Sequence, residues 1–94
     1  MGINKSDILN KVCYTELVYE RINKKLNSKA SKSEIEKMIF DIIKQTHEEY
    51  FQKIGKNIYV TNHKNNIKIT INSNTYRIIT VDIISEIHDN MHSK

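Results

Sequence analysis

The sequence predicts an α+β fold, in which N-terminal helices pack on a three-stranded antiparallel sheet and a short C-terminal helix follows (α-α-β-β-β-α). Two observations predict it. Between residues 58 and 84, apolar and polar residues alternate, with two short polar interruptions rich in Asn, as in half-buried strands joined by turns. Upstream, apolar residues recur at helical spacing. Helices and sheet each have one apolar face, so packing them together buries both faces.

Length and composition favour a single globular domain over residues 1–94. Charged residues are 28% of the chain and hydrophobic residues 38%, and no proline, linker or repeat divides it. Cys13 is the only cysteine, which excludes an internal disulfide and favours a reducing compartment. Its neighbour Val12 predicts a core position for it. Without a signal peptide or an apolar stretch of membrane length, we expect a cytoplasmic protein with no membrane contact.

Helical spacing begins near the N-terminus. Ser6 precedes a short apolar run, which predicts one or two capped helical turns. Thr15 is a candidate N-cap for the next helix, whose apolar positions are Leu17, Val18, Ile22 and Leu26. The polar residues 27–33 form the following loop. A basic run around this loop is either a solvated face or an anion-facing patch; it consists of Lys24, Lys25, Lys29 and Lys32.

The longest helix is predicted over residues 33–53, with Gly55 ending it. Ser33 with Glu36 forms a capping box at its start, and Ser31 with Glu34 is an alternative. We expect this helix to lie across the isoleucine face of the sheet. Its apolar stripe comprises Ile35, Met38, Ile39, Ile42, Ile43, Thr46, Tyr50 and Ile54.

The three strands are predicted at Asn57–Asn62, Ile67–Asn72 and residues 75–81, joined by turns at 63–66 and at Ser73-Asn74. The expected cross-strand pairs are Ile58 with Ile71, Val60 with Ile69, Ile71 with Tyr76, Ile69 with Ile78, and Ile67 with Thr80. One face is then the core, made of Ile58, Val60, Ile67, Ile69, Ile71, Tyr76 and Ile78. After the third strand, Asp82 is the candidate cap of a final helix with Ile83, Ile84, Ile87 and Met91 on one side.

The opposite face of the sheet is the candidate binding site. A tyrosine ring can stack on a base, while hydroxyls, an amide, a lysine and an arginine can contact phosphate or sugar. The predicted site residues are Tyr59, Thr61, Lys68, Thr70, Asn72 and Arg77. Arg77 is expected opposite Thr70 and should matter most, because its guanidinium can donate two parallel bonds to a phosphate. The alternatives are a half-solvated sheet face, and an Arg77 paired with Glu16 or Glu20.

No complete catalytic or metal motif occurs, and we predict no cofactor and no metal. His47-Glu48 lacks the second histidine of a zinc-protease helix, because position 51 is Phe. His88 and His92 have a spacing that permits a metal site, but a solvated tail explains them as well. His63 falls in a predicted turn, where it is either a solvated residue or a base without a partner acid.

The segment KIGKNIYVTNHKNNIKITINSNTYRIITVD, together with the upstream CYTELVYERINKKL, resembles a family of short prokaryotic proteins known only as a domain of unknown function. The resemblance runs from about Cys13 to Asp82, and ITINSNTYR is its most specific part. It implies a small self-contained domain and no particular activity or site residue. Ile, Asn and Lys supply 41 of the 94 residues, a bias of AT-rich reading frames such as those of phages and mobile elements.

The leading hypothesis is a non-enzymatic binding protein for an anionic, phosphate-bearing ligand, either a nucleotide or nucleic acid. A net charge of +4 permits such a ligand without specifying it. The alternative is a protein-interaction module, for example an inhibitor of a larger enzyme in phage counter-defence. A nuclease that uses His63 and Arg77 ranks third. We also expect a homo-oligomer, most simply a dimer, because Tyr59, Ile79 and Val81 would lie on the open face and the sheet has two unpaired edges.

Overall fold

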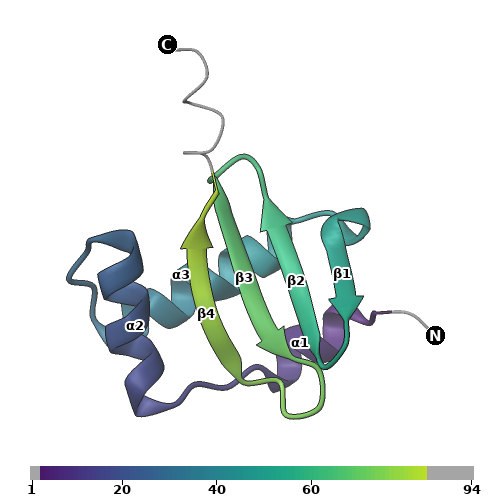
Figure 1. Cartoon of the computed structure of the whole chain (residues 1–94), viewed down its shortest axis with the longest axis horizontal. Helices are drawn as coiled ribbons and strands as arrows, with labels where there is room; N and C mark the ends of the chain where they lie inside the picture. The colour runs from purple at the N-terminus through teal and green to yellow at the C-terminus, as the bar shows by residue number, and fades with distance from the viewer. Residues whose placement is uncertain (1–2, 85–94) are drawn as a thin grey trace.

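The structure is a computed structural model that describes residues 3–84, and it has three helices followed by a four-stranded antiparallel sheet. Figure 1 shows α1 and α3 behind the sheet and α2 beside its β4 edge, with the front face uncovered. The elements are α1 (Lys5–Lys11), α2 (Glu16–Leu26), α3 (Lys32–Gln45), the 3-10 turn η1 (Glu48–Tyr50), β1 (Phe51–Ile54), β2 (Asn57–Asn62), β3 (Ile67–Asn72) and β4 (Ile78–Ile83).

The predicted three-stranded sheet is wrong by one strand, because residues 51–54 form β1 and do not continue the long helix. The strands follow one another in the order β1-β2-β3-β4. Gly55, with φ of 61°, is the first of two residues that connect β1 to β2, the position at which a type II′ hairpin turn takes glycine. Gly55 therefore makes a hairpin instead of ending a helix. Phe51 is buried opposite Val60 and anchors the short strand to the core.

Local capping sets where α3 begins. The alternative capping box is the correct one: the Ser31 hydroxyl accepts a hydrogen bond from the Glu34 N–H, and the Glu34 carboxylate accepts one from the Ser31 N–H. Thr15 is at the N-cap of α2 as predicted, but its side chain makes no capping bond. Asn4, instead of Ser6, caps α1 by accepting the Asp7 N–H.

The core lies between α3 and the isoleucine face of the sheet, as predicted. Four isoleucines of α3 recur at helical spacing and are buried, and Ile69 and Ile71 of β3 are 0% exposed against them. Apolar residues of α1 and α2 complete the same cluster; these are Ile8, Val18 and Ile22. Leu17 is predicted on the apolar side of α2. It lies outside the core, because it is 70% exposed.

The register of β2 on β3 is confirmed, whereas that of β3 on β4 is wrong. Ile58 pairs with Ile71 and Val60 with Ile69. On β4, however, Ile71 pairs with Ile78 and Thr70 with Thr80, so that Ile79 is an extra residue in a bulge. The bulge reverses the alternation beyond it, and Val81 becomes a core residue opposite Ile69.

The turn between β3 and β4 is longer than the predicted Ser73-Asn74 pair, and the Asn72 side chain explains why. Its Oδ1 accepts hydrogen bonds from the N–H groups of Asn74 and Thr75, at 2.8 and 2.9 Å. Tyr76 then takes a left-handed conformation with φ of 61°, and its N–H returns to the Asn72 carbonyl. Tyr76 is therefore a partly buried turn residue instead of the strand residue predicted opposite Ile71.

The prediction of a C-terminal helix is also wrong for Asp82 and Ile83, the part of it that the structure describes as regular secondary structure. Asp82 and Ile83 belong to β4, which continues the sheet through the proposed cap position. The remainder of that helix, including His88 and His92, lies outside the described residues. Among residues 3–84, no helix has the length and apolar character needed to cross a membrane.

The two edges of the sheet differ. On the outer side of β4, Cys13 forms a parallel bridge with Arg77, in which its N–H donates to the Tyr76 carbonyl and its carbonyl accepts from the Ile78 N–H. Further along, α2 packs against the same strand. This use of its backbone leaves the Cys13 side chain exposed, so the predicted core position is wrong. On the outer side of β1, no strand pairs among the described residues.

Candidate anion-binding groove

A groove of about 440 Å³ lies where the start of α2 faces the β3–β4 turn and the beginning of β4. Nine residues line it, and they are two arginines, two threonines, an asparagine and four apolar residues. None of the nine carries a carboxylate or an imidazole. They are Thr15, Leu17, Val18, Arg21, Asn72, Thr75, Arg77, Ile78 and Ile79.

Arg21 and Arg77 are the only two arginines of the chain, and both line this groove. Arg21 is exposed on α2, one turn after the first residues of the helix. Its Nη1 donates a hydrogen bond to the Ile79 carbonyl at 3.2 Å, across to the bulge of β4. A guanidinium has five N–H donors, so this one bond holds the side chain at the groove and leaves donors for a ligand.

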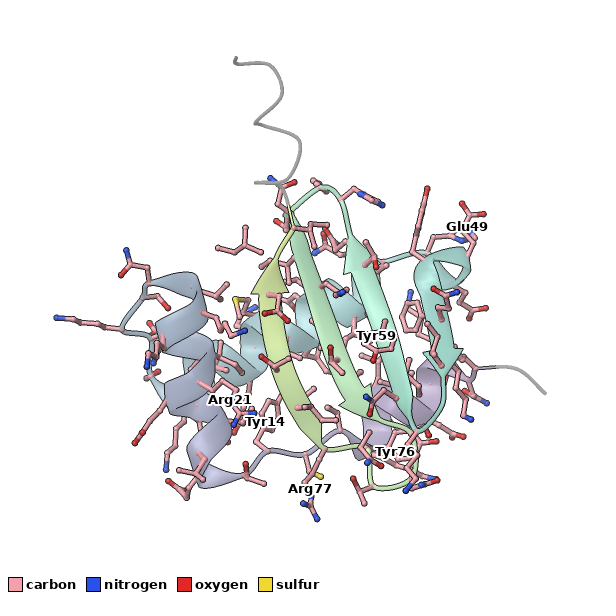
Figure 2. All side chains as sticks on the ribbon, viewed as in Figure 1. Tyr14, Arg21, Glu49, Tyr59, Tyr76 and Arg77 are labelled. Carbon is pink, nitrogen blue, oxygen red and sulfur yellow. The ribbon has the colours of Figure 1, made fainter. Side chains whose placement is uncertain are left out.

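Arg77 is placed by its backbone. Its carbonyl accepts the Asn72 N–H at 2.9 Å, which closes the β3–β4 turn, and the bridge to Cys13 holds its other side. The side chain is exposed and makes no hydrogen bond or ion pair with residues 3–84. Figure 2 shows it at the lower end of β4, pointing away from the sheet. The alternative pairing with Glu16 or Glu20 is therefore not found, since Glu16 pairs with Lys32 at 2.8 Å.

The remaining lining gives the groove both polar and apolar walls. Thr15 and Thr75 bring hydroxyl groups from opposite sides, one from the N-cap of α2 and one from the β3–β4 turn. Leu17, whose side chain is 70% exposed, provides an apolar wall together with Ile79. Guanidinium and hydroxyl donors suit a phosphate, and an adjacent apolar wall suits the flat face of a base or a sugar.

The structure brings together three of the predicted site residues on the open face of the sheet. Tyr59 and Thr61 of β2 and Lys68 of β3 line a hollow of about 350 Å³ with Gln52 and Ile54. Lys68 Nζ lies 5.5 Å from the centroid of the Tyr59 ring, a cation–π distance. Figure 2 shows Tyr59 in the middle of the sheet, well separated from Arg77.

The other predicted residues do not extend this hollow. Thr70 is only 6% exposed, and it pairs with Thr80 instead of Arg77. Asn72 uses its side-chain oxygen in the turn and lines the arginine groove. Asp82 pairs with Lys68 across the strands and forms an ion pair of 2.6 Å with Lys25 of α2. A carboxylate beside Lys68 opposes anion binding on this face, whereas the arginine groove has none in its lining.

Sequence reasoning missed Arg21 as a groove residue. The sequence marks it as exposed, because it falls outside the apolar stripe of α2, and as the only other arginine in a lysine-rich chain. That rarity is a usable indicator, since Arg and Lys are not interchangeable where two parallel bonds are needed. Its position opposite Arg77 depends on how α2 packs against β4, which no local pattern encodes.

His47 and His63 lie at the far end of the sheet. His63, in the turn after β2, packs edge-on against Tyr50 with ring centroids 5.5 Å apart, and it lines a pocket of about 250 Å³ with His47. Six residues of β3 separate this turn from the one before Arg77, so His63 and Arg77 lie at opposite ends of the sheet. They cannot act on the same bond as the nuclease hypothesis requires. Among residues 3–84, no three His, Cys, Asp or Glu side chains cluster to hold a metal ion.

An aromatic cluster at the start of α2 joins this helix to α3. The rings of Tyr14 and Tyr19 stack with centroids 5.5 Å apart, and the Tyr19 hydroxyl donates a hydrogen bond to the Glu36 carboxylate. Desolvation, followed by that bond to Glu36, raises the pKa of Tyr19 from 10.0 to about 12. Burial also raises the pKa of Tyr14 well above its ordinary value. Neither tyrosine lines the groove, whose charged side chains are the two arginines.

Residues 6–82 match a family described as a protein of unknown function, DUF3781. The chain belongs to this family. The match includes α2, the whole sheet through Asp82, and every residue that lines the arginine groove. Comparison with curated proteins and with solved structures finds no match.

Proposed function

We propose that this protein is a non-enzymatic binding protein for a phosphate-bearing anion, and that the ligand occupies the groove between α2 and the β3–β4 turn. One observation carries the proposal: the only two arginines of the chain, far apart in sequence, line the same groove, and none of its lining residues is acidic. Two guanidinium groups give a phosphate charge-assisted bonds from two directions. The absence of a carboxylate or imidazole in the lining favours binding over catalysis.

The proposed ligand site differs from the open-face site expected from the sequence. Arg77 and Asn72 stay in it, and Arg21, Thr15 and Thr75 join them. Tyr59, Thr61 and Lys68 form a separate hollow next to Asp82. Thr70 is 6% exposed and lines neither of the two sites.

Isothermal titration with ATP and with inorganic pyrophosphate, without divalent cations, tests the proposal. Both should bind to the purified protein, and the affinity should fall as salt is added. Arg77→Lys should weaken ATP binding about tenfold, because a lysine ammonium cannot reproduce the two parallel bonds of a guanidinium. Its melting temperature should hardly change, since Arg77 is exposed and an exposed substitution seldom exceeds about 0.5 kcal/mol.

A matched pair of variants separates the site from net charge. Arg77→Gln and Lys64→Gln each remove one exposed positive charge, the first from the groove and the second from the β2–β3 turn. Only Arg77→Gln should lose ATP binding. Equal losses in both variants would mean that binding depends on overall charge, and no binding by the parent protein would refute the proposed function.

A protein-interaction module is the second candidate, and β1 favours it. The outer edge of β1 pairs with no strand among residues 3–84, and Ile54 beside it is 55% exposed. An unpaired edge with an exposed apolar residue can accept a strand from a second copy or from a target protein. We propose a dimer through the β1 edge only. Val81 is in the core, and Cys13 and α2 cover the β4 edge.

Light scattering tests the β1 edge. A dimer formed there should dissociate in Ile54→Lys and persist in Ile83→Lys, which changes another exposed isoleucine at the end of β4. Added salt should have little effect on this apolar contact, in contrast to ATP binding. A monomeric parent protein at high concentration would remove the second copy as the partner of this edge.

A further inference from the structure

The end of the sheet that carries the groove is basic beyond the groove itself. Lys11 at the end of α1 and Lys56 in the β1–β2 turn are exposed, and neither is among the groove-lining residues. With Arg21 and Arg77 they are four cations from four separate segments of the chain. We call Arg21, Arg77, Lys11 and Lys56 the basic strip.

Direct contacts connect the members of the strip. Tyr76 precedes Arg77 in the chain, and Lys11 Nζ lies 5.5 Å from the centroid of the Tyr76 ring. At the other end of the same turn, the Ser73 N–H donates to the Lys56 carbonyl at 2.8 Å. The β3–β4 turn therefore runs from Arg77 past the Lys11 side chain to the backbone of Lys56. Figure 1 shows the two hairpin turns and the segment after α1 gathered at this lower end of the sheet.

One carboxylate lies close to the middle of the strip. Asp7, one helical turn before Lys11 on α1, lines a small hollow with Lys53, Ser73 and Tyr76, and Lys53 Nζ donates to the Gly55 carbonyl at 3.1 Å. Glu16, at the start of α2, is paired with Lys32 on the side of α3. The strip thus consists of four exposed cations, with Asp7 as the one carboxylate beside its middle part.

The geometry points to a nucleic acid, recognised by its phosphodiester backbone, as the ligand of the proposed anion site. A single nucleotide in the groove reaches Arg21 and Arg77, but it leaves Lys11 and Lys56 without a partner. A chain of phosphates that enters the groove and continues along the β3–β4 turn engages all four cations. This inference rests on the proposed function of the groove and specifies the class of its ligand. Each neutralised phosphate releases a counterion, so binding should weaken with added salt in proportion to the cations used.

Fluorescence anisotropy with labelled oligonucleotides of increasing length, set beside titration with ATP, tests the strip. Affinity should rise with length and exceed that for ATP. Lys11→Gln/Lys56→Gln should bind ATP as the parent does, but it should lose about tenfold or more in oligonucleotide affinity. Its plot of log affinity against log salt should be flatter by about 0.7 for each cation removed, if the strand is single.

The control is Lys44→Gln/Lys64→Gln, which removes the same charge from exposed positions at the opposite end of the sheet. It should change neither the affinity nor the salt slope. Single-stranded RNA, single-stranded DNA and the two duplexes are separate arms, because all carry phosphodiesters, and the tightest of them identifies the natural source. Heparin binding as tight as the best nucleic acid would overturn the inference, because the strip would then select charge alone.

Failure of the strip and failure of the groove give different results. If ATP binds and depends on Arg77 but oligonucleotides bind no tighter, the strip is wrong and the groove proposal stands. The same conclusion follows if both double variants lose oligonucleotide affinity equally. If neither ATP nor any oligonucleotide binds, both proposals are refuted.

Discussion

The two ends of the sheet use their polar residues in opposite ways. At the histidine end, which comprises the β2–β3 turn, His47 and η1, buried polar groups bond to one another. Asn62, 5% exposed, donates from Nδ2 to Thr46 Oγ1 at 2.8 Å, and its Oδ1 accepts the Asn65 N–H at 2.8 Å. Thr46 Oγ1 in turn donates to the Ile42 carbonyl. At the arginine end, which comprises the β1–β2 and β3–β4 turns, two arginines line a groove and two exposed lysines lie in neighbouring segments.

The difference separates a structural role from a binding role. A polar group that is buried must find an internal partner, so the Asn62 network holds α3, β2 and the β2–β3 turn together. An exposed guanidinium with donors to spare does not stabilise the fold and can hold a ligand. In Figure 2, Glu49 lies at the histidine end and Arg77 at the opposite end.

The largest expected effect is that of Ile69→Ala, in the strand β3 that connects the two ends of the sheet. Ile69 is 0% exposed in the middle of β3, between Val60 and Val81. Its truncation should lower the free energy of unfolding by about 2–5 kcal/mol. Chemical denaturation should show one transition, since β3 runs the full length between the ends. Ile83→Ala, at an exposed position away from the proposed dimer edge, is the control; an Ile69→Ala variant as stable as the parent would contradict the buried position of Ile69.

Asn62→Ala tests the histidine end alone. It removes the three hydrogen bonds of a buried side chain and leaves the Asn65 N–H without its acceptor, which should cost about 1–3 kcal/mol. ATP binding by the folded variant should equal that of the parent, because the groove lies at the other end. Lys64→Ala, at an exposed position in the same turn whose side chain makes no hydrogen bond with residues 3–84, should cost less than about 0.5 kcal/mol. A loss of ATP affinity in folded Asn62→Ala would show that the two ends are coupled.

The smallest expected effect is a pH dependence from Tyr19, beside the start of α2. Its pKa is raised from 10.0 to about 12 in the folded protein, so the unfolded chain releases this proton first as pH rises. The stability gained from the neutral phenol is complete below pH 10 and is lost between about pH 10 and pH 12. The melting temperature of Tyr19→Phe should therefore fall less steeply over that interval than that of the parent.

Tyr50→Phe, which removes an exposed phenol from the histidine end, serves as the control for this measurement. It should follow the parent curve. Identical slopes for Tyr19→Phe and the parent would mean that the bond between Tyr19 and Glu36 does not contribute to stability.

Local pattern was sufficient for much of the fold. Period-two alternation located β2 and β3 and their register, because shifting either strand by one residue would turn every isoleucine outward. Helical spacing located the buried face of α3, and the Ser31–Glu34 capping box was among the predicted starts. These features depend on residues close in sequence or on one repeated pair, so the sequence contains them directly.

The error over residues 46–54 shows where local pattern was insufficient. Thr46, Tyr50 and Ile54 have helical spacing, and nothing next to them forbids a longer helix. Thr46 instead ends α3 in an extended conformation, because its hydroxyl bonds back to Ile42 and accepts the buried Asn62 amide from β2. A residue sixteen positions away thus decides the end of the helix. The strand β1 follows, because Phe51 can then be buried against Val60.

The sequence by itself determined that the chain is an α+β domain with an isoleucine core, a basic surplus and two arginines. Only the tertiary structure decided where those arginines lie. The Asn72 turn and the bulge at Ile79 moved Arg77 away from Lys68 and Tyr59, and the packing of α2 on β4 placed Arg21 in the lining of the same groove as Arg77. The physical reason is that strand register and helix packing minimise the exposure of core residues over the whole chain. An exposed side chain has no part in that minimisation, so its neighbours follow from the packing of the core and not from its own position in the sequence.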